Sequence, residues 1–367
     1  MVEATERTDA FWMRRALTRA ERGFGRTTPN PAVGACVVTD EGVVVGCGST
    51  APAGGPHAEV RALDEAGARA RGATLYSTLE PCVHTGRTGP CTERIIASGI
   101  RRVVAAVEDP DPRVCGRGVT ALRGAGIDVE VGVCRETAVR LNQPFFTAML
   151  HHRPFVILKA ATSLDGRLAA GPGRRTVLTS GPANRRAQFM RARVDAIAVG
   201  SETVLIDDPL LTVRDVFRER PLARVIFDRR LRTPPSARVF STLGAGPVII
   251  VTSPDAKSSG DARVSALEEA GATLIAEGEG GLAPMLRRLL AFDIQCVLLE
   301  GGAAIHAAAW DEGVVDYVQI YVTPHVLGPS GVLLAEGVGR SIPSLIEPRV
   351  ETWGPDTIIE GYVHRPD

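Results

Sequence analysis

Three residues with metal-ligand chemistry and one carboxylate occur in the first quarter of this 367-residue chain. They are His57, Cys82 and Cys91, and Glu59 follows the histidine by two positions. Zinc accepts imidazole and thiolate ligands in tetrahedral geometry, and a catalytic zinc keeps its fourth position for water. A carboxylate that is not a ligand can then carry a proton from the water to a leaving group. The set predicts a catalytic Zn²⁺ site with Glu59 as proton carrier, as in zinc-dependent nucleobase deaminases.

The spacing of the two cysteines differs from the general deaminase pattern. That pattern is Cys-x-x-Cys, whereas eight residues separate Cys82 from Cys91. An alternative interpretation makes His57 a helix-start residue and both cysteines buried thiols, because cysteine is often buried. The ordered set, in strand, loop and helix context, favours zinc. The other cysteines lack ligand spacing and are expected to be small core residues: Cys36, Cys47, Cys115, Cys134 and Cys296.

Two glycine-containing segments in the second half could hold a phosphate group. Gly278–Ala283 imitates a dinucleotide fingerprint, but Glu279 would lie among the amides that bind the pyrophosphate. Glu300–Gly302 is the better candidate, because a buried strand ends there and a helix begins. Amides at a helix N-terminus bind anions, and glycine lets phosphate approach closely. A plain turn between strand and helix is the alternative.

Hydrophobic periodicity predicts alternating strands and helices around the zinc residues. A helix over 9–23, with Asp9 as N-cap, precedes a hairpin of strands at 33–40 and 43–49. Helices are then expected at 57–67, 91–98, 119–124 and 136–149, and strands at 73–79, 101–109 and 127–132. This order favours a mixed sheet covered by helices.

The pattern restarts near residue 150, so we expect domains at residues 1–150 and 151–367. Strands of the second domain are predicted at 154–161, 195–201, 223–228, 247–253, 273–278, 296–302 and 317–322. Helices between them are predicted at 183–193, 262–270 and 282–292. Both domains are therefore expected to be α/β.

Composition excludes several classes of protein. Forty-two basic residues balance forty-two acidic ones, so the chain has no broad attraction for nucleic acid. No apolar run reaches the ~18 residues of a membrane span. The polar start at 1–7 is unlike an export signal, and seven cysteines do not indicate a disulfide framework. We expect a protein of the reducing cytoplasm that binds neither nucleic acid nor membrane.

Motifs of the first half resemble the deaminase half of the bifunctional riboflavin biosynthesis proteins (RibD). They are TPNPAVG at 28–34, PHAEV at 56–60 and TLEPCVHTGRTGPC at 78–91. The resemblance implies a cytidine-deaminase-like fold, in which the eight-residue cysteine gap is normal. It implies hydrolytic removal of the 2-amino group of a diaminopyrimidinone that carries a phosphoribosylamino group. His84 and Arg87 fall on substrate positions, and arginine suits a phosphate; a solvated loop is the alternative. Asn30 lies between two prolines, and its amide is expected to contact the base or the sugar, or else to close a turn.

The second half resembles the family's reductase, whose fold is similar to dihydrofolate reductase and whose cofactor is NADPH. The clearest stretches are ATSLDGR at 161–167 and VGSETVLIDDPLLTVR at 199–214. The cofactor positions implied are Ala161, Val177, Thr203, Asp207, Gly302, Ala303, Ala304, Ile305, His306, Ala307 and Ala308. The substrate positions implied are Arg175, Arg191, Leu211, Arg214 and Glu300. Lys159 is one of only two lysines in a chain that otherwise uses arginine. Its compact ammonium is expected to hold the substrate or to assist protonation, and chance is the alternative. Hydride from NADPH would convert the ribosyl group into a ribityl group.

The chain departs from the family at the segment RTVL, residues 175–178. Many members carry Ser-x-Trp-Ile there, so a substrate serine becomes Arg175 and a cofactor tryptophan becomes Val177. Another cofactor serine is replaced by Arg229 or Arg230, whose charge is hypothesised to pair with the 2′-phosphate of NADPH. These departures keep open a degenerate reductase, or one redirected to a related pyrimidine.

Two further alternatives follow from the zinc residues alone. A nucleic-acid base deaminase is disfavoured by the cysteine gap, the zero net charge and the second domain. A purely structural zinc protein is disfavoured because Glu59 accompanies an incomplete ligand set. The family resemblance also implies a homo-oligomer.

Overall fold

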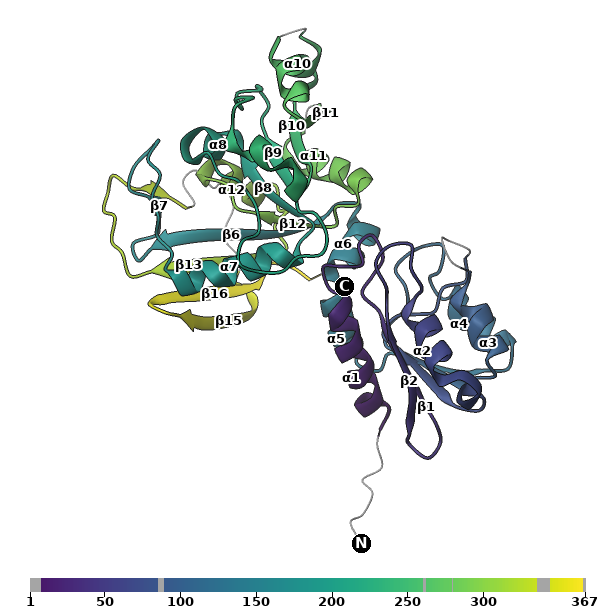
Figure 1. Cartoon of the computed structure of the whole chain (residues 1–367). Coiled ribbons are helices and arrows are strands. Elements are labelled where there is room, and N and C mark those ends of the chain that lie inside the picture. The colour runs from purple at the N-terminus through teal and green to yellow at the C-terminus, as the bar shows by residue number, and fades with distance from the viewer. Residues whose placement is uncertain (1–7, 85–88, 260–261, 279, 335–343, 366–367) are drawn as a thin grey trace. The chain divides into compact units, whose positions relative to one another are not determined.

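A computed structural model of the chain describes residues 8–84, 89–259, 262–278, 280–334 and 344–365. They form two compact units, one ending at His151 and the other beginning at His152 (Figure 1). Within the described ranges, no helix is both long and apolar enough to cross a bilayer.

The first unit is built on a five-stranded sheet with the strand order β2-β1-β3-β4-β5. β1 lies antiparallel to β2 and β3, whereas β3, β4 and β5 are parallel, so the predicted mixed sheet is confirmed. The strands are β1 Gly34–Val38, β2 Val44–Ser49, β3 Thr74–Ser77, β4 Arg102–Ala105 and β5 Asp128–Val131.

Helices cover both faces of this sheet (Figure 1). α1 (Asp9–Ala20) packs on β1 opposite Gly34, and α2 (Ala58–Ala66) packs on β2 opposite Gly46 and Gly48. A Cβ at any of these glycines would lie within about 2 Å of a helix carbonyl oxygen, so only glycine allows this approach. The remaining helices are η1 Glu21–Gly23, η2 Gly67–Ala70, α3 Cys91–Ala97, α4 Arg117–Gly124, α5 Arg135–Leu141 and α6 Gln143–His151.

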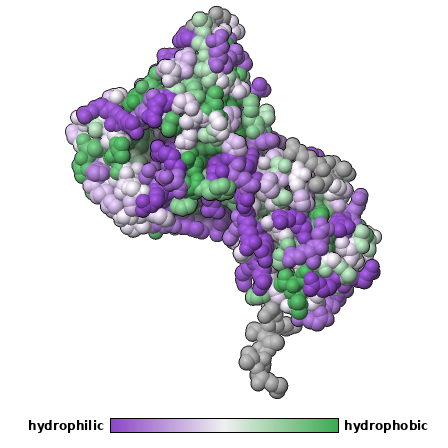
Figure 2. Space-filling model, in the orientation of Figure 1, coloured by the Kyte–Doolittle hydropathy of each residue, from purple (hydrophilic) through white to green (hydrophobic). Residues whose placement is uncertain are grey.

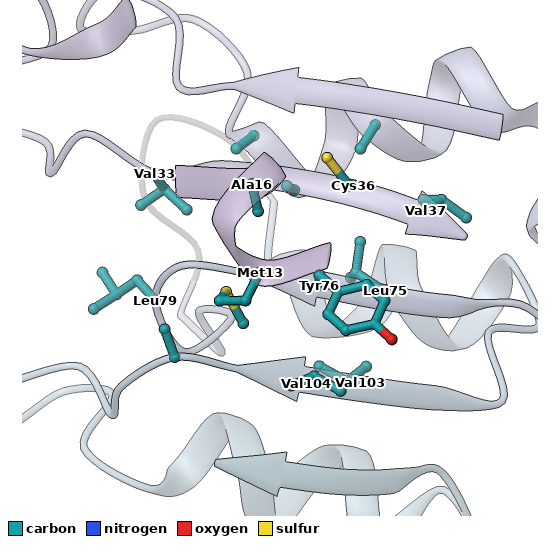
Figure 3. Close-up of a cluster of buried hydrophobic side chains, with 14 of the residues drawn as sticks. Met13, Ala16, Val33, Cys36, Val37, Leu75, Tyr76, Leu79, Val103 and Val104 are labelled. Carbon is teal, nitrogen blue, oxygen red and sulfur yellow. The ribbon is translucent and has the colours of Figure 1, made fainter. Parts of the chain in front are cut away.

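The core of the first unit includes the layer between α1 and the sheet (Figure 3), and α2 contributes buried residues on the other face. Met13 and Ala16 of α1 are fully buried, and the face of the sheet that α1 covers carries Cys36 of β1 and Tyr76 of β3. Met13 and Ala16 are three residues apart, and this helical spacing of apolar residues is the kind of pattern from which the helix at 9–23 is predicted.

Two predicted details of the first unit are wrong. Thr8, not Asp9, is the N-cap of α1, because the Asp9 carboxylate instead binds the Arg102 guanidinium and the Tyr76 hydroxyl. The helix predicted at 136–149 is two helices that meet at Asn142. The Asn142 side chain bonds to the backbone N–H and C=O of Ala32, and this tertiary contact fixes the break.

The prediction that five cysteines are small core residues is confirmed for Cys36 and Cys296, which are buried. Cys47 and Cys134 are partly buried and Cys115 is exposed, so for these three it is wrong. All seven cysteines are free thiols.

The second unit is built on a nine-stranded sheet with the order β11-β10-β9-β8-β12-β6-β13-β16-β15. The strands from β11 to β13 are parallel, and β16 runs antiparallel to both of its neighbours, β13 and β15. Their bounds are β6 Phe155–Ser163, β8 Ala196–Gly200, β9 Ala223–Phe227, β10 Val248–Thr252, β11 Ala272–Ala276, β12 Cys296–Leu299, β13 Tyr317–Thr323, β15 Ile346–Trp353 and β16 Asp356–Tyr362. A small ribbon pairs β7 (Arg167–Ala169) with β14 (Val332–Leu333).

Alternate residues of each central strand enter two separate hydrophobic cores. Val156 and Leu158 of β6 face the core that contains α11, whereas Phe155 and Ile157 face the core that contains α10. This period of two explains why nearly continuous apolar runs form buried parallel strands here. The helices are α7 Gly181–Arg193, α8 Ser201–Asp207, η3 Arg238–Ala245, α9 Pro254–Ser258, α10 Ala262–Glu269, α11 Leu282–Leu289, η4 Leu290–Phe292 and α12 Ala303–Asp311.

Candidate functional sites

The zinc residues lie where two helices of the first unit begin. His57 is the N-cap of α2, but its ring forms no capping hydrogen bond and is free to turn towards the cysteines. Cys91 is the first residue of α3, and Cys82 lies in the loop between β3 and α3. The sheet and both helices therefore hold the three side chains together.

The distances among these side chains fit one metal ion. His57 Nδ1 lies 3.3 Å from Cys91 Sγ and 3.6 Å from Cys82 Sγ, and all three ligand atoms lie within 4.8 Å of one another. Tetrahedral zinc with ordinary bond lengths separates its nitrogen and sulfur ligands by about 3.5 Å. No other group of three such side chains meets this criterion among the described residues. The predicted set of His57, Cys82 and Cys91 is thus brought together with zinc-like geometry.

Charge favours a cation at this position. The contact with the Cys91 thiol lowers the pKa of Cys82 to about 4, and the His57 ring and the Cys91 N–H act in the same direction. The thiolate is the form that binds metal. The bond with Cys82 raises the pKa of His57, so its proton is held until a metal displaces it.

Glu59 lies on the first turn of α2, beside the three ligands, and only 4% of it is exposed. Its carboxylate is 3.4 Å from the Ser77 hydroxyl of β3. Burial raises the pKa of Glu59 to about 7, and the nearby His57 opposes this rise. A carboxylic acid with a pKa near neutrality can both accept and release a proton, which is the property required of a proton carrier.

A residue whose role the sequence analysis missed, Glu80, positions the loop that carries Cys82. Its buried carboxylate accepts hydrogen bonds from the backbone N–H groups of Asp109, Gly116 and Val119 at 3.1, 2.9 and 3.0 Å. Gly118 completes the fit, because a Cβ there would lie 2.1 Å from the Pro81 carbonyl oxygen. The motif TLEPC contained the signal, since a glutamate beside a ligand-bearing loop needs a partner when buried.

The predicted substrate contacts of the first unit lie in loops. Asn30 lies before β1 in a turn in which its backbone N–H donates to the Thr27 carbonyl. His84 is partly buried, its Nδ1 has no hydrogen-bond partner, and the Asp111 carboxylate lies nearby. Arg87 lies outside the described residues.

The second unit contains a cavity of about 700 Å³. Figure 2 shows a hollow in this unit near α8 and α12. The cavity lies at the carboxyl ends of the adjacent parallel strands β8, β12 and β6, where open α/β sheets bind ligands. It is lined by these predicted residues: Lys159, Ala161, Thr203, Asp207, Glu300, Gly302, Ala303, Ala304, Ile305 and His306.

An ion pair lies at the base of this cavity. Arg191, on the last turn of α7, donates to both carboxylate oxygens of Glu300 at 2.9 and 2.6 Å. Burial opposes ionisation of Glu300, but Arg191 and Lys159 hold its pKa at about 2. Burial lowers the pKa of Lys159, whose ammonium lies 4.9 Å from the centre of the Tyr321 ring. The cavity therefore places the ionised Glu300 carboxylate beside Lys159, whose ammonium loses its proton more readily than a free lysine.

The N-terminus of α12 forms one wall of the cavity. Gly302 is the N-cap, and a Cβ there would meet only Thr203 Oγ1, at 3.8 Å, so the amides behind it are open to a ligand. Gly301 must be glycine, because a Cβ would lie 2.0 Å from Ile305. The geometry suits a phosphate or another anion.

The other dinucleotide-like segment is already occupied by a side chain of the protein. The N–H groups of Leu282 and Ala283, at the start of α11, donate to the Glu312 carboxylate at 2.7 and 2.8 Å. These amides are therefore not open to a pyrophosphate, in agreement with the preference for Glu300–Gly302.

Several predicted reductase residues do not line the cavity. Val177 is 75% exposed, and Arg175 interacts with Asp207 from outside the lining. Leu211 is buried in the core, Arg214 is tied to α7 through Gln188, and Arg229 and Arg230 are exposed after β9. Ala307 and Ala308 lie further along α12. Conversely, Arg167 and Arg174 line the cavity and were missed, although Arg167 ends the motif ATSLDGR.

Comparison with known proteins assigns both units to described families. Residues 154–359 match the family described as "RibD C-terminal domain", and residues 6–107 match the "Cytidine and deoxycytidylate deaminase zinc-binding region". The riboflavin biosynthesis protein RibD of Aquifex aeolicus is 42% identical over 354 residues, which cover 96% of this chain and 97% of that protein. The protein of the same name from Escherichia coli is 41% identical, over 87% of this chain and 89% of that protein.

Solved structures give the same result over nearly the whole chain. RibD of Acinetobacter baumannii has a TM-score of 0.87 at 36% identity, covering 96% of this chain and 98% of that one. A diaminohydroxyphosphoribosylaminopyrimidine deaminase/5-amino-6-(5-phosphoribosylamino)uracil reductase of Thermotoga maritima has a TM-score of 0.83 at 34% identity, with the same coverage.

We predict that Glu80→Gln weakens the zinc site without altering a ligand. The amide offers one acceptor oxygen in place of two, which leaves a buried backbone N–H unpaired and lowers the free energy of unfolding by about 1–3 kcal/mol. Urea denaturation and competition with a zinc chelator would measure both effects. Glu93→Gln, on the exposed side of α3, is the control, and equal zinc affinity in the two variants would contradict the role of Glu80.

A second prediction concerns His306, which is buried. Burial lowers its pKa from 6.5 to about 4, while the Leu299 carbonyl and Glu300 favour the charged form and Lys159 disfavours it. The folded state therefore resists protonation and loses stability as the pH falls from 6.5 to 4, by up to about 3 kcal/mol. His306→Leu should flatten this part of the pH profile of urea denaturation. The exposed His325→Leu should leave it unchanged, and two identical profiles would refute the assignment.

Proposed function

Because this chain belongs to the RibD family of bifunctional deaminase/reductase proteins of riboflavin biosynthesis, we propose a division of labour between its two units. Residues 1–150 remove the amino group from 2,5-diamino-6-(5-phosphoribosylamino)pyrimidin-4(3H)-one. Residues 151–367 reduce the product with NADPH to 5-amino-6-(5-phosphoribitylamino)uracil. The observation that carries the first half is the convergence of His57, Cys82 and Cys91 beside buried Glu59.

The deaminase step replaces an amine with a carbonyl oxygen at the cost of one water and releases ammonia. Zinc held by His57, Cys82 and Cys91 supplies the Lewis acid that activates water at neutral pH. Glu59 accepts a proton from the attacking water and delivers it to the departing amine, a role supported by its burial and its near-neutral pKa. Asn30, His84 and Arg87 are proposed to hold the substrate.

The reductase step needs a nucleotide cofactor, and the cavity of the second unit has the features to hold one. NADPH, when bound, supplies a hydride to the opened sugar. The amides at the start of α12 and the side chains of Thr203 and Asp207 are proposed to bind the cofactor. Arg191 holds Glu300 in place, so that Glu300 and Lys159 can orient the sugar and keep a proton at its oxygen. Exclusion of water by the buried base of the cavity favours hydride transfer.

The remaining predicted residues are proposed to contact the substrate or the cofactor, whether or not they line the cavity. Arg175, Arg214 and Leu211 are proposed to meet the substrate, and Val177, Ala161 and the run Gly302–Ala308 to meet the cofactor. We also propose that the protein acts as a homo-oligomer in the cytoplasm on this small molecule, and not on nucleic acid.

One observation favours a second candidate function. Val177, at a position where the family resemblance implies tryptophan, is 75% exposed and does not line the cavity, which is consistent with the loss of one stacking surface for the cofactor. A reductase redirected to a related pyrimidine would show the same change. Anaerobic turnover of the phosphoribosyl substrate with and without NADPH, followed by mass spectrometry, separates the two. An increase by two hydrogens over the deaminated compound supports reduction, and its absence with active deaminase supports the second candidate.

We predict that Glu59→Gln abolishes deamination while zinc stays bound. The amide keeps the size of the side chain but cannot carry the proton, so the rate should fall by about a hundredfold or more. Ammonia release gives the rate, and metal analysis gives the zinc content. Retained deamination would show that another group carries the proton.

We predict that Lys159→Met lowers reduction by about a hundredfold or more and leaves deamination unchanged. Methionine preserves the length and apolar packing of this partly buried side chain, so the unit should remain folded. Lys257→Met is the matched control, because the other lysine of the chain bonds to the Leu274 carbonyl on a different element. NADPH oxidation on the deaminated intermediate measures the effect, and equal rates in both variants would exclude Lys159 from the step.

A further inference from the structure

Two cysteines outside the zinc site face each other across a hairpin of the first unit. Cys36 of β1 and Cys47 of β2 are direct cross-strand partners, and their Sγ atoms lie 3.2 Å apart. Neither belongs to the metal-ligand group of His57, Cys82 and Cys91. The pair therefore needs an explanation that the two activities do not supply.

The position of the pair in the sheet suits a covalent cross-link. The Thr50 N–H donates to the Val33 carbonyl, so Val33 and Thr50 are a hydrogen-bonded pair of this antiparallel ladder. Hydrogen-bonded and non-hydrogen-bonded pairs alternate along such a ladder, which makes Cys36 and Cys47, three positions further on, a non-hydrogen-bonded pair. The Cys47 N–H is consistent with this, because it donates away from β1, to the Glu65 carboxylate at 2.8 Å. Cα atoms in such pairs lie about 4.5 Å apart, inside the range of roughly 4.4–6.8 Å found in disulfides.

The two thiols differ in access and charge. Cys36 is fully buried under α1, near Ala16, as Figure 3 shows, whereas Cys47 lies on the edge strand and is partly exposed. The hydrogen bond from Cys36 lowers the pKa of Cys47 to about 6, burial opposes this, and Arg19 of α1 adds to the lowering while Glu65 of α2 works against it. One sulfur is thus an accessible nucleophile and the other is held beside it in the core.

We propose that Cys36 and Cys47 form an oxidation site that reacts with peroxides and closes to a disulfide. The Cys47 thiolate attacks one peroxide oxygen, the O–O bond breaks, and with hydrogen peroxide one water leaves as Cys47 becomes a sulfenic acid. The Cys36 sulfur then attacks Cys47, its proton leaves with the hydroxyl as a second water, and the S–S bond forms. The two thiols lose two electrons to the peroxide, and a thiol reductant reverses the change.

The cross-link should leave the zinc site intact. The Cys36–Cys47 pair lies on the α1 face of the hairpin, whereas Gly46 and Gly48 of β2 turn their other face to α2, which carries Glu59. Closing the pair draws together two side chains that already touch, so α2 need not move.

The test treats the zinc-loaded, full-length protein with hydrogen peroxide, unfolds it and alkylates the remaining thiols. Non-reducing digestion and mass spectrometry should show a peptide linking Cys36 to Cys47, lighter by two hydrogens, which dithiothreitol converts back. Exposed Cys115 reports within the same molecule that the oxidant was present in excess. Zinc content should not change.

Variants separate the two steps. In Cys36→Ala, Cys47 should stop at the sulfenic acid and be labelled by dimedone, whereas Cys47→Ala should leave Cys36 reduced. Cys134→Ala, which removes another partly buried thiol, should form the linked peptide as the unchanged protein does. Free alkylation of both Cys36 and Cys47 when Cys115 is already oxidised would overturn the proposal, as would a link between Cys82 and Cys91 with loss of zinc. The peptide map of the unchanged protein decides the matter even where a variant does not fold.

Discussion

The deaminase site depends on the attachment of one loop to the sheet. Three ligands arrive from three segments, and two of them already stand at the start of a helix, where regular backbone fixes them. Cys82 has no such support, because it lies in the irregular chain between β3 and α3. Glu80 substitutes for regular structure by gathering three backbone N–H groups from the segment that follows β4. A buried carboxylate that loses these partners is costly, so the loop has one stable position.

In the second unit, the topology of the sheet brings the polar residues of the cavity together. Parallel strands present their carboxyl ends at one edge, and there β8, β12 and β6 lie side by side. Lys159 and Glu300 become neighbours through the register of β6 and β12, although many residues separate them in the chain. Arg191 enters from α7 and locks the carboxylate from the other side. Polar groups from distant segments thus meet without any loop having to be shaped for the purpose.

Much of this architecture was predictable from the sequence, and the failures have two causes, a weak local pattern and contacts with distant residues. Local signals predicted the buried strands of both sheets and the zinc residues. These signals are short apolar runs for the strands and a histidine followed by two cysteines for the zinc site. The hairpin of β15 and β16 was missed, because β15 alternates weakly and carries several exposed residues. The break at Asn142 and the N-cap at Thr8 were missed because distant partners, Ala32 in one case and Arg102 in the other, decide them. The family resemblance supplied the positions in the reductase that local patterns left ambiguous, but it could not tell which of them line the cavity.

The glycines that face α2 have a consequence for how sequence variation in this protein is interpreted. Gly46 and Gly48 belong to no catalytic motif, yet a side chain at either would push α2 outward, and α2 carries both His57 at its start and Glu59 in its first turn. An allele altered at one of these two positions would retain every catalytic residue and still be expected to encode an impaired deaminase. A screen that inspects only the active-site motif would score such an allele as functional. The defect would be seen only in the larger distance between the backbones of β2 and α2.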